Sequence, residues 1–499
     1  MKYLILLPIM VPLFMGLLLF CLPQKMLAGK EGAKHPFAKI HTLFAVGMLL
    51  SAGANIWAMA SGIAQNPVVL FELLDGIPVV FVIDEAGMLF SIVTTIGFLA
   101  AGAFSFRYMK GEKTYYGFYI LTYAVLQGLD FAGNLLTMYL FFELVTLLSF
   151  PLVLQTRTHE SLMAALKYLF YSLCGAYMGL FGIYVLYQNT TSIAFKAGGT
   201  LDMNLVAEHP GFVLTAIFLA LLGFGVKAGM FPLHAWLPTA HPVAPAPASA
   251  VLSGVIVKAG VLAIIRVVFY IVGPEFLSGT WVQLVWMILT LVTVFMGSLL
   301  AYKEKVLKKR LAYSTVSQLS YILFGIALLN PVALTGSLLH VVFHAFIKIV
   351  LFLCAGAIIH ETGCENVDEL RGIGKKMPVT LLVFTVASLG LIGIPPTGGF
   401  LSKWYLATGA LTAGVGAIGY VGPVMLLASA LLTAGYLLPI TINGFFPGDD
   451  FDYEANPRKE ASPWMWVPMV ILVLLSVLGG IFPDVILDLI EWIPAVIFH

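Results

Sequence analysis

The stretch from Val226 to Arg266, VKAGMFPLHAWLPTAHPVAPAPASAVLSGVIVKAGVLAIIR, decides the fold of the chain. It contains the end of one apolar helix, a Pro-rich break and most of a second helix. Irregular backbone of this kind is tolerated at membrane depth only where protein or a water-filled cavity surrounds it. Lys227 and Lys258 lie in apolar surroundings on either side of the break, and charged residues in such places usually line ion pathways. The stretch therefore predicts a membrane protein that moves ions.

The composition agrees with this interpretation. Of the 499 residues, 60% are hydrophobic and 10% are charged, whereas a soluble domain carries about 25% charged residues. The net charge of +1 and the lack of a basic run give no indication of nucleic-acid binding. The cysteines are far apart and show no CxxC or other metal spacing, which argues against a disulfide framework, an iron–sulfur cluster or a structural zinc site. They are Cys21, Cys174, Cys354 and Cys364.

Apolar stretches of about 20 residues, the length that crosses a bilayer, predict an all-α polytopic membrane protein with about fourteen transmembrane helices. The expected spans are 3–22, 38–60, 79–105, 115–133, 135–155, 161–187, 211–230, 246–272, 281–301, 308–328, 332–360, 378–410, 417–444 and 464–482. The first is interpreted as a retained helix, because no small-x-small cleavage site follows it. The amphipathic tail from Asp484 is expected to lie on the membrane surface.

The lysines and arginines of the loops predict the orientation. With both termini outside, eighteen loop Lys and Arg residues face the cytoplasm and only Lys2 and Lys196 face out, as the positive-inside rule requires. Six basic residues remain inside predicted spans: Lys167, Lys227, Lys258, Arg266, Lys348 and Lys403. At roughly 2.5–3.5 kcal/mol each, six uncompensated charges would cost on the order of 15–20 kcal/mol. We therefore expect them to be paired, hydrated or neutral, with protonation set by their neighbours.

Glu143 is the obvious neighbour, because it is the only carboxylate at the centre of a predicted span. Asp130 and Asp84 lie nearer the ends of their spans and are accessory candidates, as is Lys167. A static buried ion pair between Glu143 and one lysine is the simpler alternative, but one pair would not account for six basic residues.

Three ionisable residues follow one another at i, i+4 spacing in HVVFHAFIK: His340, His344 and Lys348. This spacing places them on nearly one face of a helix, where they predict a proton relay or a hydrated channel. Two histidines at this spacing can also bind a metal, but no third ligand stands at a recognisable spacing. His234 and His241 flank the Pro-rich break and are candidates for the pathway or for satisfied core positions.

A second break, GLIGIPPTGGFLSKWYL, interrupts the twelfth span, and Lys403 follows it closely. Two interrupted helices at corresponding places in two halves indicate an inverted-repeat transporter. The predicted organisation is N-terminal helices 1–3 in residues 1–114, a first repeat of helices 4–8 in 115–272 and a second repeat of helices 9–13 in 273–444. A loop, helix 14 and the amphipathic tail occupy 445–499. Helices 7 and 12 are the broken ones.

From about Asp84 to Tyr405 the chain resembles the antiporter-like subunits of respiratory complex I, Mrp-type multisubunit Na⁺/H⁺ antiporters and membrane-bound hydrogenases. The motifs that carry the resemblance are Asn134–Glu143, Lys227–Arg266, KKRLAYSTVSQ at Lys308–Gln318, HVVFHAFIKIVLFLCAGAIIH at His340–His360 and IPPTGGFLSKW at Ile394–Trp404. The sequence departs from the family at Asn134, where many relatives have Asp, and at Val306, where relatives often have Asp.

The resemblance implies a fourteen-helix core and a proton path along a central hydrophilic axis. Glu143 and Lys227 match the family's glutamate–lysine pair, whose separation is expected to change with the state of a neighbouring subunit. Lys258 matches the bridging lysine. The histidine pair with Lys348 matches the polar region of helix eleven, and Lys403 matches the terminal lysine, where some members carry Glu. This lysine and the short C-terminus are similar to the Mrp D-type and hydrogenase-type subunits.

The resemblance further implies a multi-pass subunit of the cell membrane, surrounded by other membrane subunits and handling protons and, in Mrp-type members, Na⁺. No nucleophile triad, phosphate loop or dinucleotide fingerprint is present in the sequence, so we expect no cofactor in this chain. Iron–sulfur or nickel–iron centres would belong to partner subunits. Two other functions stay open: a stator subunit whose buried charges lock helices together, and an independent secondary transporter for a small anion.

Overall fold

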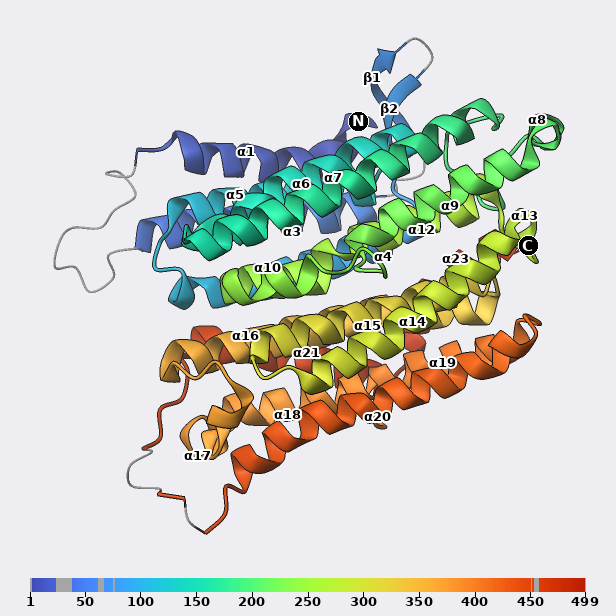
Figure 1. Ribbon diagram of the computed structural model, residues 1–499. Coiled ribbons are helices and arrows are strands. Elements are labelled where there is room, and N and C mark those ends of the chain that lie inside the picture. The colour runs from blue at the N-terminus through green and yellow to red at the C-terminus, as the bar shows by residue number, and fades with distance from the viewer. Residues whose placement is uncertain are drawn as a thin grey trace.

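The computed structural model describes residues 2–23, 38–61, 67–74, 77–449, 451–452 and 457–498. In these ranges the chain is mostly helical, with helices running side by side along one direction (Figure 1). Eleven of the described helices are long and apolar enough to cross a membrane. This confirms a polytopic helical membrane protein.

The elements of the first half are the strands β1 (Val68–Leu74) and β2 (Ile77–Phe81) and the helices α1 (Leu7–Cys21), α3 (Ala38–Ala60), α4 (Glu85–Tyr108), α5 (Lys113–Asp130), α6 (Leu135–Val153), α7 (His159–Gln188), α8 (Met203–Glu208), α9 (Pro210–Lys227), α10 (Leu237–Val243), α11 (Ala246–Val251), α12 (Lys258–Ile265) and α13 (Pro274–Leu277). The helices of the second half are α14 (Trp281–Lys303), α15 (Leu307–Ala327), α16 (Pro331–Thr362), α17 (Ile373–Lys376), α18 (Pro378–Ile392), α19 (Gly398–Thr412), α20 (Ala417–Phe445), α21 (Pro463–Ile481), α22 (Asp484–Ile490) and α23 (Trp492–Phe498). Short 3₁₀ turns cover Lys2–Leu6, Leu154–Thr156 and Val367–Leu370.

A β-hairpin precedes α4, where the sequence predicted helix from residue 79 onward. β1 and β2 pair antiparallel, and Asn134 Nδ2 donates a hydrogen bond of 2.7 Å to the carbonyl of Pro78 in β2. α4 begins only after Asp84, whose Oδ1 accepts from the amide of Gly87 at 2.9 Å. The prediction was wrong here because the apolar residues of β2 were counted as helix. An N-cap acid before the first helical turn marks the true start.

The longest helix, α16, carries the predicted polar stripe. Asn330 caps it by accepting hydrogen bonds from the amides of Val332 and Ala333, and Gly363 ends it in the left-handed conformation, with φ 77°. Its 32 residues span about 48 Å at 1.5 Å per residue, more than the hydrocarbon thickness. α16 packs against α15, α18, α19, α21 and α11, so its middle is surrounded by protein and not by lipid.

Both predicted breaks are present. α9 ends at Lys227 and α10 begins ten residues later, at Leu237, while α18 ends at Ile392 and α19 begins at Gly398. A cis peptide bond precedes a proline in each break. After the first break and α10, the helical run 246–272 is continuous. It contains two π-helical segments, Leu252–Ile256 and Arg266–Val272, on either side of α12. π-helical turns are rare and frequently lie at functional sites.

The C-terminal tail forms two short helices, α22 and α23, which pack against α16 and α4. Ile490, Ile493 and Ile497 are buried there, while Trp492 and Val496 are exposed. The tail therefore packs some apolar side chains against α16 and α4 and exposes others, and its position on the membrane surface stays a prediction. In Figure 1 both ends of the chain lie toward the end of the bundle that carries the hairpin and α13, and α17 lies at the opposite end.

Candidate functional site

Lys227, the last residue of α9, is buried among hydroxyl groups. Its Nζ donates to Thr146 Oγ1 at 2.6 Å and to Tyr168 OH at 2.9 Å, and it lies 4.9 Å from the centre of the Tyr168 ring. Tyr168 OH in turn is 2.7 Å from Ser149 Oγ. Two hydroxyl groups thus hold the Lys227 amino group, and none of the ion pairs between described residues includes it.

Glu143 is in none of the ion pairs between described residues, so the static buried pair with a lysine, which was the simpler alternative, is not formed in this structure. Its Oε1 is buried and has no hydrogen-bond partner in the described part of the chain. Thr146, which binds Lys227, follows Glu143 by three residues on α6, and residues three apart are neighbours on a helix surface. The carboxylate is therefore close to the lysine along the α6 surface but makes no ion pair with it.

Lys258 and His344 join the two halves of the chain. Lys258 Nζ lies 2.9 Å from His344 Nδ1 and donates to the carbonyl of Ser253 at 3.1 Å. Ser253 belongs to the π-helical segment just before α12, five residues before Lys258, so the irregular turn supplies one ligand of the ammonium group. His344 Nε2 has no hydrogen-bond partner among the described residues. The imidazole therefore has one nitrogen free to take part in a further transfer.

His340 continues the line from α16 toward α19. Its Nδ1 lies 2.9 Å from Ser402 Oγ and its Nε2 3.1 Å from Gln318 Oε1. The His340 and His344 rings stack with centroids 5.7 Å apart. Lys403 directly follows Ser402, the α19 residue that contacts His340.

Lys403 closes the end of α18. Its Nζ donates to the carbonyls of Leu391 and Ile392 at 2.6 and 2.9 Å, which are the last two residues of that helix. A cation at a helix C-terminus is stabilised by the helix dipole. Its ammonium group also lies 5.1 Å from the centre of the Tyr321 ring.

Lys348, which follows His340 and His344 on the same face of α16, makes its hydrogen bonds to α15. Its Nζ donates to Ser314 Oγ and, at 3.0 Å, to the carbonyl of Leu311. The next hydroxyl on α15, Thr315, is 2.7 Å from Ser253 Oγ. Adjacent hydroxyl residues of α15 thus contact Lys348 on one side and Ser253, whose carbonyl binds Lys258, on the other.

The predicted accessory acids have structural partners. Asp84 forms a two-armed ion pair with Arg266, in which NH2 donates to Oδ1 at 2.7 Å and NH1 donates to Oδ2. Arg266 is 1% exposed and lies over the rings of Phe195 and Tyr270. Asp130 is buried and accepts from Thr94 Oγ1 at 3.1 Å. The sequence indicated both acids but did not identify Arg266 as the partner of Asp84.

The other accessory candidates surround α10. Lys167 Nζ donates to Thr239 Oγ1 at 3.0 Å. His241 is fully buried, stacks on Phe352 at 4.6 Å, and neither ring nitrogen has a hydrogen-bond partner in the described chain. His234 Nδ1 is also unpartnered there, and its ring stacks on Phe231. His241 is therefore not the hydrogen-bonded core histidine that was the alternative interpretation.

The count of loop charges treats Lys308 as a cytoplasmic loop residue, but α15 begins at Leu307 and buries it. Its Nζ donates to the carbonyls of Pro242 and Ala244 at the end of α10. It also lines a cavity of about 380 Å³ together with Glu112 and Glu365. Near Val306, the position where relatives often have Asp, Glu304 forms an ion pair with Lys309, with Nζ and Oε2 2.8 Å apart.

Several polar residues of the site were not identified as site residues from the sequence, although four of them lie inside the motifs quoted above. These are Thr146, Ser149, Tyr168, Ser253, Ser314, Gln318 and Ser402. Single hydroxyl and amide residues are common in membrane helices, so only the packing shows which of them face the ionisable groups. Within the described residues no group of three or more His, Cys, Asp or Glu is placed to hold a metal ion.

Comparison with known proteins identifies the family. The family model described as "NADH:quinone oxidoreductase/Mrp antiporter, TM" matches residues 132–433. The chain is 35% identical to the N-type NADH-quinone oxidoreductase subunit of Desulforudis audaxviator over 82% of this chain and 83% of that protein. It is 29% identical to the D-type Na⁺/H⁺ antiporter subunit of Bacillus subtilis over 96% of this chain and 94% of that protein.

Solved structures have the same fold. A chain of the Mrp complex from Dietzia sp. superposes with a TM-score of 0.81 at 22% identity, over 100% of this chain and 97% of that one. A chain of respiratory complex I from Thermus thermophilus gives 0.80 at 22% identity, over 99% of each. The matched segment contains the buried lysines and histidines described above, and the chain belongs to the family of membrane subunits shared by NADH:quinone oxidoreductases and Mrp antiporters.

Proposed function

We propose that protons cross this subunit along the buried line formed by Glu143, Lys227, Lys258, the His340–His344 pair and Lys403, with Lys348 beside it. The class of function follows from the family: the chain is a proton-translocating, antiporter-like membrane subunit of a multisubunit complex. The contact between Lys258 Nζ and His344 Nδ1, at 2.9 Å, is the observation that carries the path. This contact supports the proposal because it joins two ionisable side chains, one from each half of the chain, across a distance that a proton can cross.

The separation of Glu143 from Lys227 gives the path a control point. At an effective dielectric constant near 20, moving a carboxylate from about 8 to about 4 Å strengthens its interaction with an ammonium group by roughly 2 kcal/mol. That is about a 30-fold change in the population of the charged lysine. A neighbouring subunit that moves α6 could therefore load Lys227 or release its proton toward Lys258. The arrangement described here, with Lys227 on Thr146 and Tyr168, corresponds to the separated state.

Transport by the purified complex in proteoliposomes, followed with a pH-sensitive dye, tests this proposal. We expect Lys227→Ala and Glu143→Gln to abolish coupled transport in complexes whose assembly is verified on native gels. Lys303→Gln, which changes an exposed lysine in the last turn of α14, is the matched control. Normal transport by an assembled Lys227→Ala complex would sink the mechanism. Loss of assembly without loss of specific transport would support the stator alternative.

The finer architecture is also a proposal. Fourteen crossings result if α5, α15 and the α18–α19 pair cross the membrane beside the eleven longer helices, and each of them packs against at least one of those helices. We propose that α5–α12 and α14–α20 are the two inverted repeats, each with one break near a buried lysine. An even number of crossings would place both termini on the same side, and the excess of Lys and Arg in the opposite loops assigns that side to the outside. A C-terminal alkaline phosphatase fusion, active only outside the cytoplasm, tests the orientation.

The identity of the driving complex is a separate question. The buried line has no residue set that distinguishes Na⁺ exchange from redox-driven pumping, and both kinds of complex occur among the relatives. Purification of the complex in mild detergent, with its polypeptides identified and its metals assayed, separates the two. Iron–sulfur or nickel-bearing partners indicate a redox-driven pump, and small hydrophobic partners without metal indicate an antiporter.

A further inference from the structure

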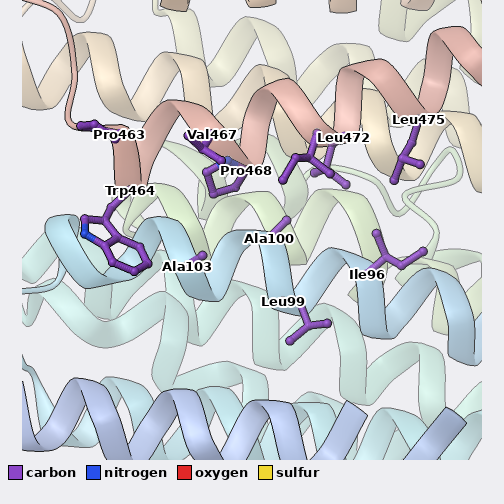
Figure 2. A pocket seen from close by; sticks show the side chains of 11 residues that line it. Ile96, Leu99, Ala100, Ala103, Pro463, Trp464, Val467, Pro468, Leu472 and Leu475 are labelled. Carbon is purple, nitrogen blue, oxygen red and sulfur yellow. The ribbon is translucent and has the colours of Figure 1, made fainter. Parts of the chain in front are cut away.

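An apolar groove of about 590 Å³ lies between α4 and α21, on the surface of the bundle and away from the buried line. Ile96, Leu99, Ala100 and Ala103 of α4 line one side. The other side consists of α21 residues from Pro463 to Leu475 (Figure 2). The only polar side-chain atom among the lining residues is the indole nitrogen of Trp464. The groove therefore suits a hydrocarbon ligand.

The length of the groove matches one leaflet of a bilayer. Trp464 and Leu475 are eleven residues apart on α21, which is about 17 Å along the helix axis. Half the hydrocarbon thickness is about 15 Å. A transmembrane helix of a partner would need a groove through the full thickness, so a single acyl chain fits better.

One end of the groove has the features of a headgroup region. Trp464 is 61% exposed and packs edge-on against Phe106, with ring centroids 5.4 Å apart. Tryptophan is enriched where the membrane meets water. The opposite end, at Ile96 and Leu475, contains only aliphatic side chains (Figure 2).

A cation lies at this same end as Trp464. Ile96, Ala100, Ala103 and Arg107 follow i, i+4, i+7, i+11 spacing, so Arg107 continues the groove-lining face of α4 one turn beyond Ala103. It is exposed and takes part in none of the ion pairs between described residues. Basic residues at the ends of membrane helices bind anionic headgroups.

We propose that the groove between α4 and α21 binds an anionic phospholipid, with one acyl chain along the groove and the phosphate at Arg107. The loop charges predict that this end of α4 faces the cytoplasm, which assigns the lipid to the cytoplasmic leaflet. The acyl chain is already in hydrocarbon, so its contacts with the groove contribute through van der Waals packing and not through removal from water, and the arginine selects the headgroup.

The test uses the complete complex in nanodiscs containing trace phosphatidylglycerol with a photoactivatable group in its acyl chain. Phosphatidylcholine with the same chain is the comparison, and mass spectrometry of peptides locates the cross-links. We expect α4 and α21 peptides around Ala100 and Leu472 to be labelled several-fold more by the anionic lipid. Arg107→Gln should remove this preference, while Lys303→Gln, an equivalent change at the end of α14, should leave it intact.

A second variant tests the acyl-chain position independently of charge. Ala100→Trp fills the groove and should lower labelling by both lipids, with transport by the complex showing that the variant is folded. Equal labelling by the two lipids, or an unchanged preference in Arg107→Gln, would overturn the headgroup assignment. Cross-links from groove residues to a partner polypeptide instead of lipid would overturn the proposal as a whole.

Discussion

The contact between Lys258 and His344 makes a quantitative prediction, because its two nitrogens are 2.9 Å apart. At an effective dielectric constant of about 20, two protonated groups at this distance repel each other by about 6 kcal/mol. The pair therefore holds one proton at a time, and a proton that arrives at one partner favours release from the other. This behaviour suits a transfer step better than a storage site.

The variant His344→Gln isolates this step. Its amide can keep the hydrogen bond to Lys258 but cannot carry a proton. A proton must then pass the site as an unassisted buried charge, which costs about 2.5–3.5 kcal/mol. Since 1.36 kcal/mol is a factor of ten in rate, we expect proton transport in proteoliposomes to fall about 100-fold while native gels show normal assembly.

A double-mutant cycle decides whether the two residues act in one path. If they do, Lys258→Met combined with His344→Gln should transport no more slowly than the worse single variant, because the same step is already blocked. Losses that multiply would place them on separate routes. Wild-type transport by an assembled His344→Gln complex would refute the reasoning altogether.

Three further predictions concern the surroundings of this contact. Lys403→Arg keeps a hydrogen-bond donor for the carbonyls at the end of α18, but a guanidinium group does not release its proton. Proton transport should therefore fall at least tenfold while thermal stability is unchanged. Wild-type transport by this variant would show that Lys403 only caps the end of the helix. Arg266→Met leaves Asp84 as an uncompensated, partly buried charge, and breaking a buried pair in this way lowers the free energy of unfolding by about 3–5 kcal/mol. Thermal stability in detergent should therefore drop. Asp84→Asn added to the same chain should recover part of that stability. Gly260→Ala would place a methyl group 2.5 Å from the carbonyl oxygen of Phe224. This clash should force α12 away from α9 and slow proton transport. Gly211→Ala in α9 is the control, because its methyl group would meet no atom within 4 Å, and it should behave as wild type.

Helix positions were largely predictable, because long apolar runs and proline breaks act locally. The failures had local causes as well. The residues of β2 are as apolar as a helix, and only the cap at Asp84 shows where α4 starts. Lys308 stands in a basic cluster that is typical of a loop, yet the carbonyls at the end of α10 provide two acceptors for it inside the protein.

The partners of the site residues were less predictable than the residues themselves. The i, i+4 spacing correctly places His340, His344 and Lys348 on one helix, but a helical period does not say which neighbour each will meet. His344 meets Lys258, which is 86 residues away in the chain, whereas Lys348 meets α15. Likewise, the sequence indicated that Glu143 and Lys227 are coupled, but it did not indicate the hydroxyl groups of α6 and α7 that bind Lys227.

The hydrogen bonds of the buried line are interrupted between Lys227 and Lys258, and we expect external control to act at this interruption. Hydrogen bonds between described residues join Lys227 to α6 and α7, and others join Lys258 to α16, but none connects these two sets. α12 nevertheless crosses α9 closely here, since a methyl group on Gly260 would lie 3.0 Å from Cβ of Lys227. The backbones are thus in contact while the two ammonium groups are bound to different partners. On the proposed path, transfer between them requires Lys227 to leave its hydroxyl ligands, and we expect the position of Glu143, one turn from Thr146, to set the free energy of that departure. On this proposal, a subunit that shifts α6 would control proton flow without touching the histidines.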